Sequence, residues 1–252
     1  MTNKNYTFEV CIDSVQSAIN AQEAGAHRVE LCDNLFEGGT TPSAGMIKKV
    51  KEAAPNILLF VIIRPRGGDF LYSKEEIDVM LADIEIAKSL GADGIVSGAL
   101  TKDGEIDLST TQKLISACQG LPFTFHRAFD MCKDPEQALE QLIELGAQRI
   151  LTSGLKQTAE LGAVIIAKLV QQANKRITIL VGSGVKPQNI ATIATTTLAH
   201  EFHFSARKEN NSPMAYKNKD INMGGIPGLP EFSLFYSDPN IIKSTIEELS
   251  KI

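Results

Sequence analysis

Pro122-Phe-Thr-Phe-His-Arg-Ala-Phe-Asp130, at the midpoint of the chain, combines a short apolar strand with ionisable residues at its carboxyl end. Side chains alternate across a strand, so His126 lies on the opposite face from Phe123 and Phe125. An apolar outer face followed by ionisable groups is typical of a barrel enzyme, whose active site is built at the strand ends. The function is therefore to be sought at the carboxyl ends of this strand and its neighbours.

Strand and helix patterns alternate on both sides of this stretch, which gives eight strands that are each followed by a helix. Three helices end in Gly-Ala just before the next strand, as short helix-to-strand turns require. Eight equal units predict an α/β fold, a single TIM-like (β/α)8 barrel domain over residues 1–252. The other seven strands are predicted at residues 8–12, 28–32, 57–65, 94–100, 149–154, 177–181 and 201–206.

A long segment after the eighth strand, residues 207–239, has no apolar period and is predicted to be irregular. Loops of this length without structure are usually functional or disordered. Because the segment leaves the strand at the end where a barrel's active site lies, it either closes over that site as a lid or forms a mobile surface excursion. It carries Gly224, Gly225, Pro227, Gly228 and Pro230.

Composition and charge exclude several classes of partner. A formal charge of -5 and a pI near 5.5 argue against nucleic acid or an anionic membrane. No apolar run approaches the roughly 20 residues that span a bilayer, and the polar start predicts no signal peptide. The four cysteines are irregularly spaced and make no disulfide framework, so the expected compartment is the cytoplasm.

Alternation also predicts which side chains point into the barrel. On each strand the apolar residues are assigned to the outer face, against the helices, and the intervening residues to the interior. Burying charged groups is costly unless they pair, so the polar interior residues should form a linked network. This predicted set comprises Glu9, Glu30, Arg64, His126 and His203.

Within this set, we expect Glu30, Arg64 and His126 to form one hydrogen-bonded cluster at the barrel mouth, with Asp130 and Glu9 close by. An arginine keeps a neighbouring carboxylate ionised, and a histidine exchanges protons near neutral pH. Such a catalytic cluster could take a proton from a carbon or hydroxyl of a bound anion, with Arg64 holding the anion's charge. The alternative is a static ion-pair network that only fills a polar barrel centre.

A further expectation concerns the ends of the seventh and eighth strands. Gly182, Ser183 and Gly184 offer backbone N–H groups at the start of a predicted helix. Phosphate in such barrels is often held by the loops after these two strands and by a helix amino terminus. The sequence therefore predicts an anion site formed by these three residues together with Ser205 and Arg207.

Two cysteines give the only hint of a metal. The chain has no C-x-x-C, no H-E-x-x-H and no pair of histidines at helical spacing. Cys11 and Cys32, however, fall at equivalent inward positions on neighbouring strands. Two thiolates suit a soft ion such as Cu(I) better than zinc or magnesium. The alternative is a pair of small cysteines buried in the core without a ligand.

At these residues the chain resembles the CutC copper-homeostasis family over nearly its whole length. The resemblance implies a TIM-like barrel, a cytosolic protein, frequent self-association and a role in copper homeostasis through Cu(I) binding. It is specific because so many stretches match in the right order. They are EVCIDS (9–14), RVELC (28–32), GGTTPS (38–43), IRPR (63–66), GDF (68–70), FHRAFD (125–130), LTSG (151–154) and HFSAR (203–207).

Two functions from different classes follow. The first, implied by the resemblance, is a cytoplasmic and homo-oligomeric copper-homeostasis protein that binds Cu(I). The second is an enzyme that acts on a small phosphorylated or carboxylated metabolite by acid–base chemistry. The second follows from the residue types, because Glu, Arg, His, Asp and Gly dominate the matched stretches and resemble an anion pocket more than a soft-metal site.

Overall fold

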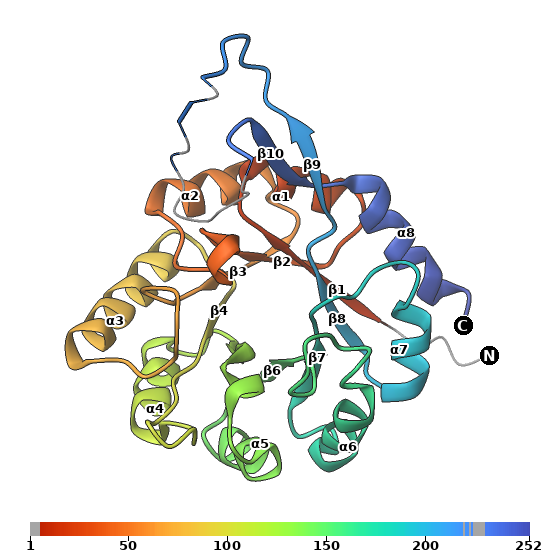
Figure 1. The fold of residues 1–252 in the computed structure, drawn as a ribbon. Coiled ribbons are helices and arrows are strands. Elements are labelled where there is room, and N and C mark those ends of the chain that lie inside the picture. The colour runs from red at the N-terminus through yellow and green to blue at the C-terminus, as the bar shows by residue number, and fades with distance from the viewer. Residues whose placement is uncertain (1–5, 219, 222, 224–229) are drawn as a thin grey trace.

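The computed structural model describes residues 6–218, 220–221, 223 and 230–252, and its centre is a closed barrel of parallel strands (Figure 1). The strands follow chain order around the barrel, and the last pairs with the first. The predicted TIM-like (β/α)8 barrel is confirmed. The strands are β1 (Thr7–Ile12), β2 (Arg28–Leu31), β3 (Leu58–Ile62), β4 (Gly94–Ser97), β5 (Phe123–Phe125), β6 (Arg149–Thr152), β7 (Thr178–Val181) and β8 (Glu201–Phe204).

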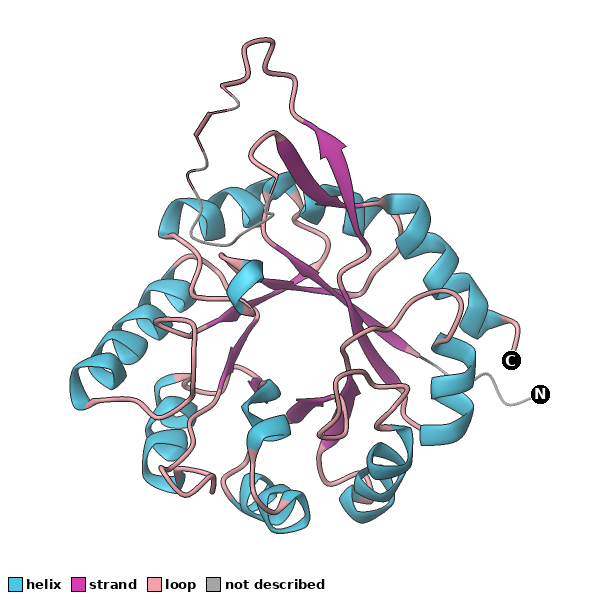
Figure 2. Ribbon diagram, in the orientation of Figure 1, coloured by secondary structure: helices cyan, strands magenta, loops and turns pink. Residues whose placement is uncertain are grey.

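Helices surround the barrel on its outside (Figure 2). Several begin where a serine caps the first turn: the side chains of Ser14, Ser43 and Ser73 each accept a backbone N–H three residues on. None of the helices in the described ranges has the length and apolar composition needed to cross a membrane. The helices are α1 (Val15–Glu23), α2 (Ala44–Ala53), α3 (Lys74–Ser89), α4 (Leu108–Ala117), α5 (Pro135–Glu144), α6 (Ala163–Ala173), α7 (Ile190–Thr197) and α8 (Pro239–Ser250), with short 3-10 helices η1 (Leu35–Glu37) and η2 (Arg127–Met131).

Two separate groups of buried apolar residues reflect the alternation of side chains along each strand. Val10, Val29 and Phe202 belong to the large outer core between the strands and the helices. A smaller group lies inside the barrel and consists of Cys11, Cys32, Phe60, Ile62 and Val96. The inner and outer faces predicted for β1, β2 and β8 are thus confirmed.

Phe60 fills the middle of the barrel. Its ring lies between two guanidinium groups, with Arg28 Cζ at 4.9 Å and Arg149 Cζ at 4.7 Å from the ring centroid. Gly94 on the neighbouring strand makes room for it, because a Cβ there would lie 2.4 Å from the ring. The barrel interior around Phe60 is therefore a packed layer of aromatic and charged groups.

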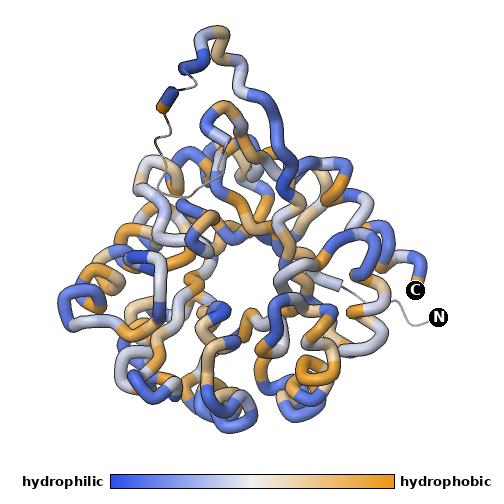
Figure 3. Tube along the Cα trace, viewed as in Figure 1, coloured by the Kyte–Doolittle hydropathy of each residue, from blue (hydrophilic) through white to orange (hydrophobic). Residues whose placement is uncertain are grey.

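The segment after β8 begins and ends as strand, so the prediction of an irregular segment is wrong at both ends. β9 (Arg207–Asn211) and β10 (Ser233–Ser237) form an antiparallel hairpin. β9 has no apolar period because it is hydrophilic throughout and largely exposed (Figure 3). The hairpin is held instead by backbone pairing and by α1, where Ser237 N donates to Ser17 Oγ at 3.0 Å and Asn20 donates to Ser237 O at 2.8 Å.

The hairpin formed by β9 and β10 does not close over the barrel opening, which was one of the two alternatives for this segment. It lies against α1 at the edge of the barrel (Figure 1). Pro230 precedes β10 in the described part of the segment. The glycines and proline on which the lid hypothesis partly depended, Gly224, Gly225, Pro227 and Gly228, lie outside the described residues.

Candidate functional site

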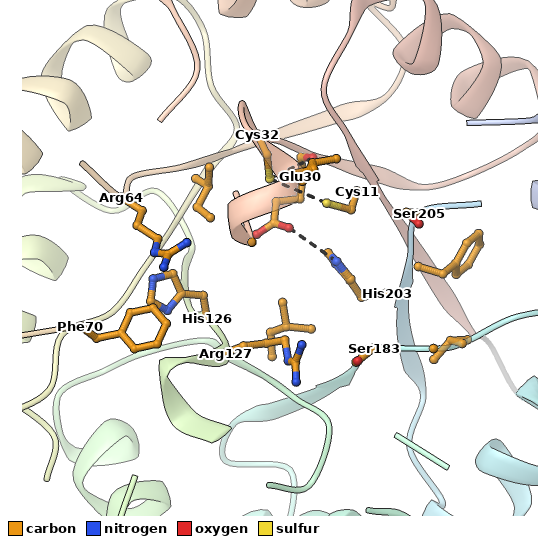
Figure 4. A pocket seen from close by; sticks show the side chains of 17 residues that line it. Cys11, Glu30, Cys32, Arg64, Phe70, His126, Arg127, Ser183, His203 and Ser205 are labelled. Carbon is orange, nitrogen blue, oxygen red and sulfur yellow. Dashed lines mark hydrogen bonds and ion pairs between the residues drawn. The ribbon is translucent and has the colours of Figure 1, made fainter. Parts of the chain in front are cut away.

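A cavity of about 270 Å³ opens at the carboxyl ends of the strands. Sulfur, carboxyl and imidazole groups from Cys11, Cys32, Glu30 and His203 gather on one side of it (Figure 4). A basic and aromatic group gathers on the other side, formed by Arg64, Phe70 and His126 (Figure 4). The two sides offer different chemistry, and each is described in turn.

The two cysteines lie next to each other, as alternation predicted. β1 and β2 pair in parallel, with Cys11 beside Glu30 in the register and Cys32 directly after β2. The two Sγ atoms are 3.7 Å apart, and both side chains are buried. Both cysteines are free thiols that line the cavity.

The surroundings of the two cysteines shift their pKa values in opposite directions. The hydrogen bond with Cys32, helped by His203, outweighs the effect of burial and lowers the pKa of Cys11 to about 5. The same hydrogen bond, together with burial, raises the pKa of Cys32 well above its ordinary value. At neutral pH the pair therefore holds a Cys11 thiolate that accepts a hydrogen bond from the Cys32 thiol.

Beneath the thiols, a fully buried carboxylate joins three strands. Glu9 accepts a hydrogen bond from Arg28 Nε on β2, and its Oε1 lies 2.7 Å from His203 Nδ1 on β8. Burial by itself would raise the pKa of Glu9, but Arg28 and His203 outweigh burial and hold it at about 2. Arg28 reaches further to Glu201, at 2.7 Å. Glu9 is thus an ionised anchor below the cavity.

His203 connects this anchor to the cavity, because its Nε2 lies 3.6 Å from Glu30 Oε2. Burial opposes a charge on His203, but Cys11, Glu30 and Glu9 together raise its pKa well above the ordinary value. Burial also raises the pKa of Glu30, and His203 offsets that only in part.

Two groups of side chains are close enough together to hold a metal ion. Ligand atoms of Cys11, Glu30 and Cys32 all lie within 4.8 Å of one another, as do those of Glu9, Glu30 and His203.

The expected hydrogen-bonded cluster of Glu30, Arg64 and His126 is not formed, so that expectation is wrong. All three line the cavity, but Glu30 faces His203 while the Arg64 guanidinium donates to backbone carbonyls. The reason is that Arg64 follows the end of β3, where its side chain donates hydrogen bonds to carbonyl groups of the neighbouring loops. Catalytic roles for these residues stay predictions.

Asp130 also lies elsewhere than expected. The chain turns into η2 directly after His126, which carries Asp130 over the loop that follows β6. There its carboxylate accepts from Arg127 Nε at 2.7 Å and from Ser153 N at 3.0 and 3.1 Å. Asp130 does not line the cavity, and its hydrogen bonds tie η2 to the neighbouring loop.

The predicted anion site is assembled only in part. Ser183, Gly184 and Ser205 line the cavity, but Gly182 N donates to the Thr152 carbonyl and continues the strand ladder. No helix starts at this glycine turn, since α7 begins at Ile190.

Arg207, which was predicted to bind the anion, does not line the cavity. It pairs with Asp13 at 3.0 Å, and its Cζ lies 5.1 Å from the Phe36 ring and 5.0 Å from the Phe235 ring. Its cationic group is therefore used to hold the β9–β10 hairpin on the barrel.

Residues in the polar layer were missed by the sequence reasoning. Arg28 lies two positions before Glu30 and so shares its inward face, and alternation could have assigned it. Arg149 and Glu201 begin their strands, and Arg149 Nε lies 3.5 Å from Glu201. A charged residue at the start of a strand is usually exposed, so no sequence pattern indicated that these two lie inside the barrel.

Comparisons with known proteins show the family of this chain. The sequence model of the CutC family matches residues 6–208. The chain belongs to the CutC family. A family protein CutC from Bacteroides fragilis is 53% identical over 247 residues, which cover 98% of each chain. The human copper homeostasis protein cutC homolog is 48% identical over 246 residues, which cover 98% of this chain and 89% of that one.

Solved structures show the same architecture. The putative copper homeostasis protein CutC from Streptococcus agalactiae has a TM-score of 0.76 and 38% identity, and the match covers 79% of this chain and 98% of that one. Phosphoribosyl anthranilate isomerase from Thermotoga maritima has a TM-score of 0.57 at 14% identity, covering 98% of this chain and 100% of that one. The likeness to the isomerase concerns the fold alone.

Replacing the buried Glu9 carboxylate by an amide should destabilise the protein strongly. Glu9→Gln leaves Arg28 and His203 buried without their counter-charge, which typically costs about 3–5 kcal/mol in the free energy of unfolding. Urea unfolding measures the effect. The control is Glu140→Gln, which removes an exposed pair with Arg176 and should leave stability near the wild-type value. Equal stability of the Glu9→Gln variant and the wild type would contradict the anchor role.

His126 should make stability depend on pH. Burial, with the nearby Arg64 charge, lowers the pKa of His126 from 6.5 to about 3. Below 6.5 the unfolded chain therefore binds a proton that the folded chain refuses, so folding stability falls as pH drops from 6.5 towards 3. Between pH 7 and pH 5 this contribution amounts to about 2 kcal/mol.

The measurement is urea unfolding of the wild type and of His126→Asn at both pH values. The variant should lose about 2 kcal/mol less than the wild type between them. Asparagine keeps an acceptor near the Nδ1 position, so the backbone turn after β5 can remain. If both proteins lose the same amount, His126 is not a buried neutral imidazole.

Proposed function

We propose that this chain takes part in copper homeostasis by binding one Cu(I) ion between the sulfurs of Cys11 and Cys32. The single observation that carries the proposal is the 3.7 Å separation of the two sulfurs. With metal–thiolate bonds of roughly 2.3 Å, two sulfurs on one ion lie at most roughly 4.6 Å apart. The pair therefore needs little movement to hold an ion.

The chemistry of the donors supports a soft ion. Thiolate sulfur favours Cu(I) over hard ions such as magnesium. Cys11 is poised as a thiolate, and Cys32 would release its proton when the ion binds. Two thiolates and one Cu(I) carry a net charge of -1, and the protonated His203 beside them offsets that charge.

The relatives support the same role. The human relative is named copper homeostasis protein cutC homolog, and the Streptococcus agalactiae protein of known structure is named putative copper homeostasis protein CutC. We place the function in the cytoplasm, where thiols are kept reduced and free to bind metal. The four buried free cysteines fit that setting.

A competition against a Cu(I) chelator under anaerobic conditions tests the proposal. The wild type should bind one ion per chain, and Cys11→Ser or Cys32→Ser should weaken binding by more than the roughly 10- to 100-fold typical of an outer-shell change. Cys118→Ser is the matched control, because Cys118 is equally buried but lies at the end of α4. A Cys11→Ser, Cys32→Ser double variant with wild-type affinity would overturn the proposal.

A further inference from the structure

Arg64 is a buried cation without a counter-ion. Only 4% of the residue is exposed, yet no carboxylate of the described residues lies within ion-pair distance of its guanidinium group, whereas every other arginine of the chain pairs with a carboxylate. Its two terminal nitrogens donate to the carbonyls of Glu37, Gly39 and Gly68 at 2.8 to 2.9 Å. Its Nε has no acceptor among the described residues. A buried charge without a partner is costly, which points to an anion that is supplied from outside.

A second buried donor without an acceptor comes from His126, which is also 4% exposed. The ring's Nδ1 accepts the backbone N–H of Ala128 at 3.2 Å, so the proton of the neutral ring is on Nε2. Gly98 packs against the Nδ1 edge, since a Cβ at Gly98 would lie 2.9 Å from that nitrogen. Nε2 has no acceptor in the described part of the chain. Leaving such a donor unpaired costs stability unless a ligand accepts from it.

The two residues that carry these buried donors, Arg64 and His126, lie on one side of the cavity (Figure 4). Phe70 holds them there, with the Arg64 Cζ atom at 5.0 Å and the His126 ring centroid at 5.0 Å from its own ring. The same three side chains line the cavity. They are set apart from the thiol pair of Cys11 and Cys32 (Figure 4).

We propose that this side of the cavity binds a small organic carboxylate, with one oxygen accepting from Arg64 Nε–H and the other from His126 Nε2–H. One guanidinium charge and two N–H groups match the single charge and two oxygens of a carboxylate. A phosphate carries up to two charges and more oxygens than these donors satisfy. The rest of the ligand would meet an apolar wall that includes Leu35, Ile62 and Leu151. The cavity volume of about 270 Å³ suits a small organic acid of up to about the size of benzoate.

This carboxylate site is independent of copper, so its test is done on metal-free protein. Calorimetric titration with acetate, butyrate and benzoate, and with inorganic phosphate for comparison, measures the preference. At least one monocarboxylate should bind saturably and more tightly than phosphate. Tighter binding of phosphate, or no saturable binding of any of the three carboxylates, would overturn the proposal.

Two variants of the same residue locate the site. His126→Asn keeps an acceptor for Ala128 N–H but places no donor near Nε2, so it should weaken carboxylate binding about tenfold or more. His126→Gln restores an amide donor near that position and should recover part of the affinity. Arg64→Lys keeps the charge, loses the Nε donor and should also weaken binding. Unchanged affinity in both His126→Asn and Arg64→Lys would overturn the assignment.

The Cys11→Ser, Cys32→Ser double variant separates this proposal from the copper proposal. It should bind the carboxylate as the wild type does, because the thiols lie outside the carboxylate site. Loss of carboxylate binding in that variant, with its fold retained by circular dichroism, would place the ligand on the thiols and overturn the assignment. Conversely, His126→Asn should keep its Cu(I) affinity.

Discussion

The buried carboxylate of Glu9, held between Arg28 and His203, is the interaction on which the candidate site depends. It joins β1 to β2 on one side and to β8 on the other, at the place where the barrel closes. An ionised Glu9 favours the charged form of His203. The charge on His203 in turn favours the thiolate of Cys11. The hydrogen bond from Cys32 is the larger cause of the lowered Cys11 pKa, and the charged His203 adds to it.

The cavity combines two kinds of chemistry because different walls of the barrel supply its sides. β1 and β2 contribute sulfur and carboxyl groups, which suit a soft ion at the thiols. β3 and β5 lead into Arg64 and His126, which are hard donors that suit an oxygen anion. The sequence hypotheses of a metal site and an anion site therefore need not exclude each other. Both are proposals about separate sides of one cavity.

Alternation along strands explains what could be predicted from the sequence. The inward positions of Cys11, Glu30 and His203 follow from a period of two, because each strand has apolar neighbours that must face the helices. The same rule could have included Arg28. Alternation does not predict the side-chain directions of Arg64 and Asp130, because both residues lie beyond a strand end, where the conformation of the loop decides the direction. The cluster expected around Arg64 failed for that reason.

The hairpin after β8 shows a second limit of pattern reading. β9 carries Arg207, Lys208 and Glu209 in succession and has no buried face to impose a period. Its pairing with β10 depends on residues more than twenty positions away, which no local pattern reports. Arg207 looked like an anion ligand for the same reason: its partner Asp13 lies at the far end of the sequence.

X-ray absorption at the copper edge of the Cu(I)-loaded protein tests the central claim most directly, because it identifies the atoms bound to the ion. The account predicts two sulfur ligands in the wild type and the loss of one of them in Cys32→Ser. A wild-type spectrum with only nitrogen and oxygen ligands, or a spectrum that Cys32→Ser leaves unchanged, would contradict it.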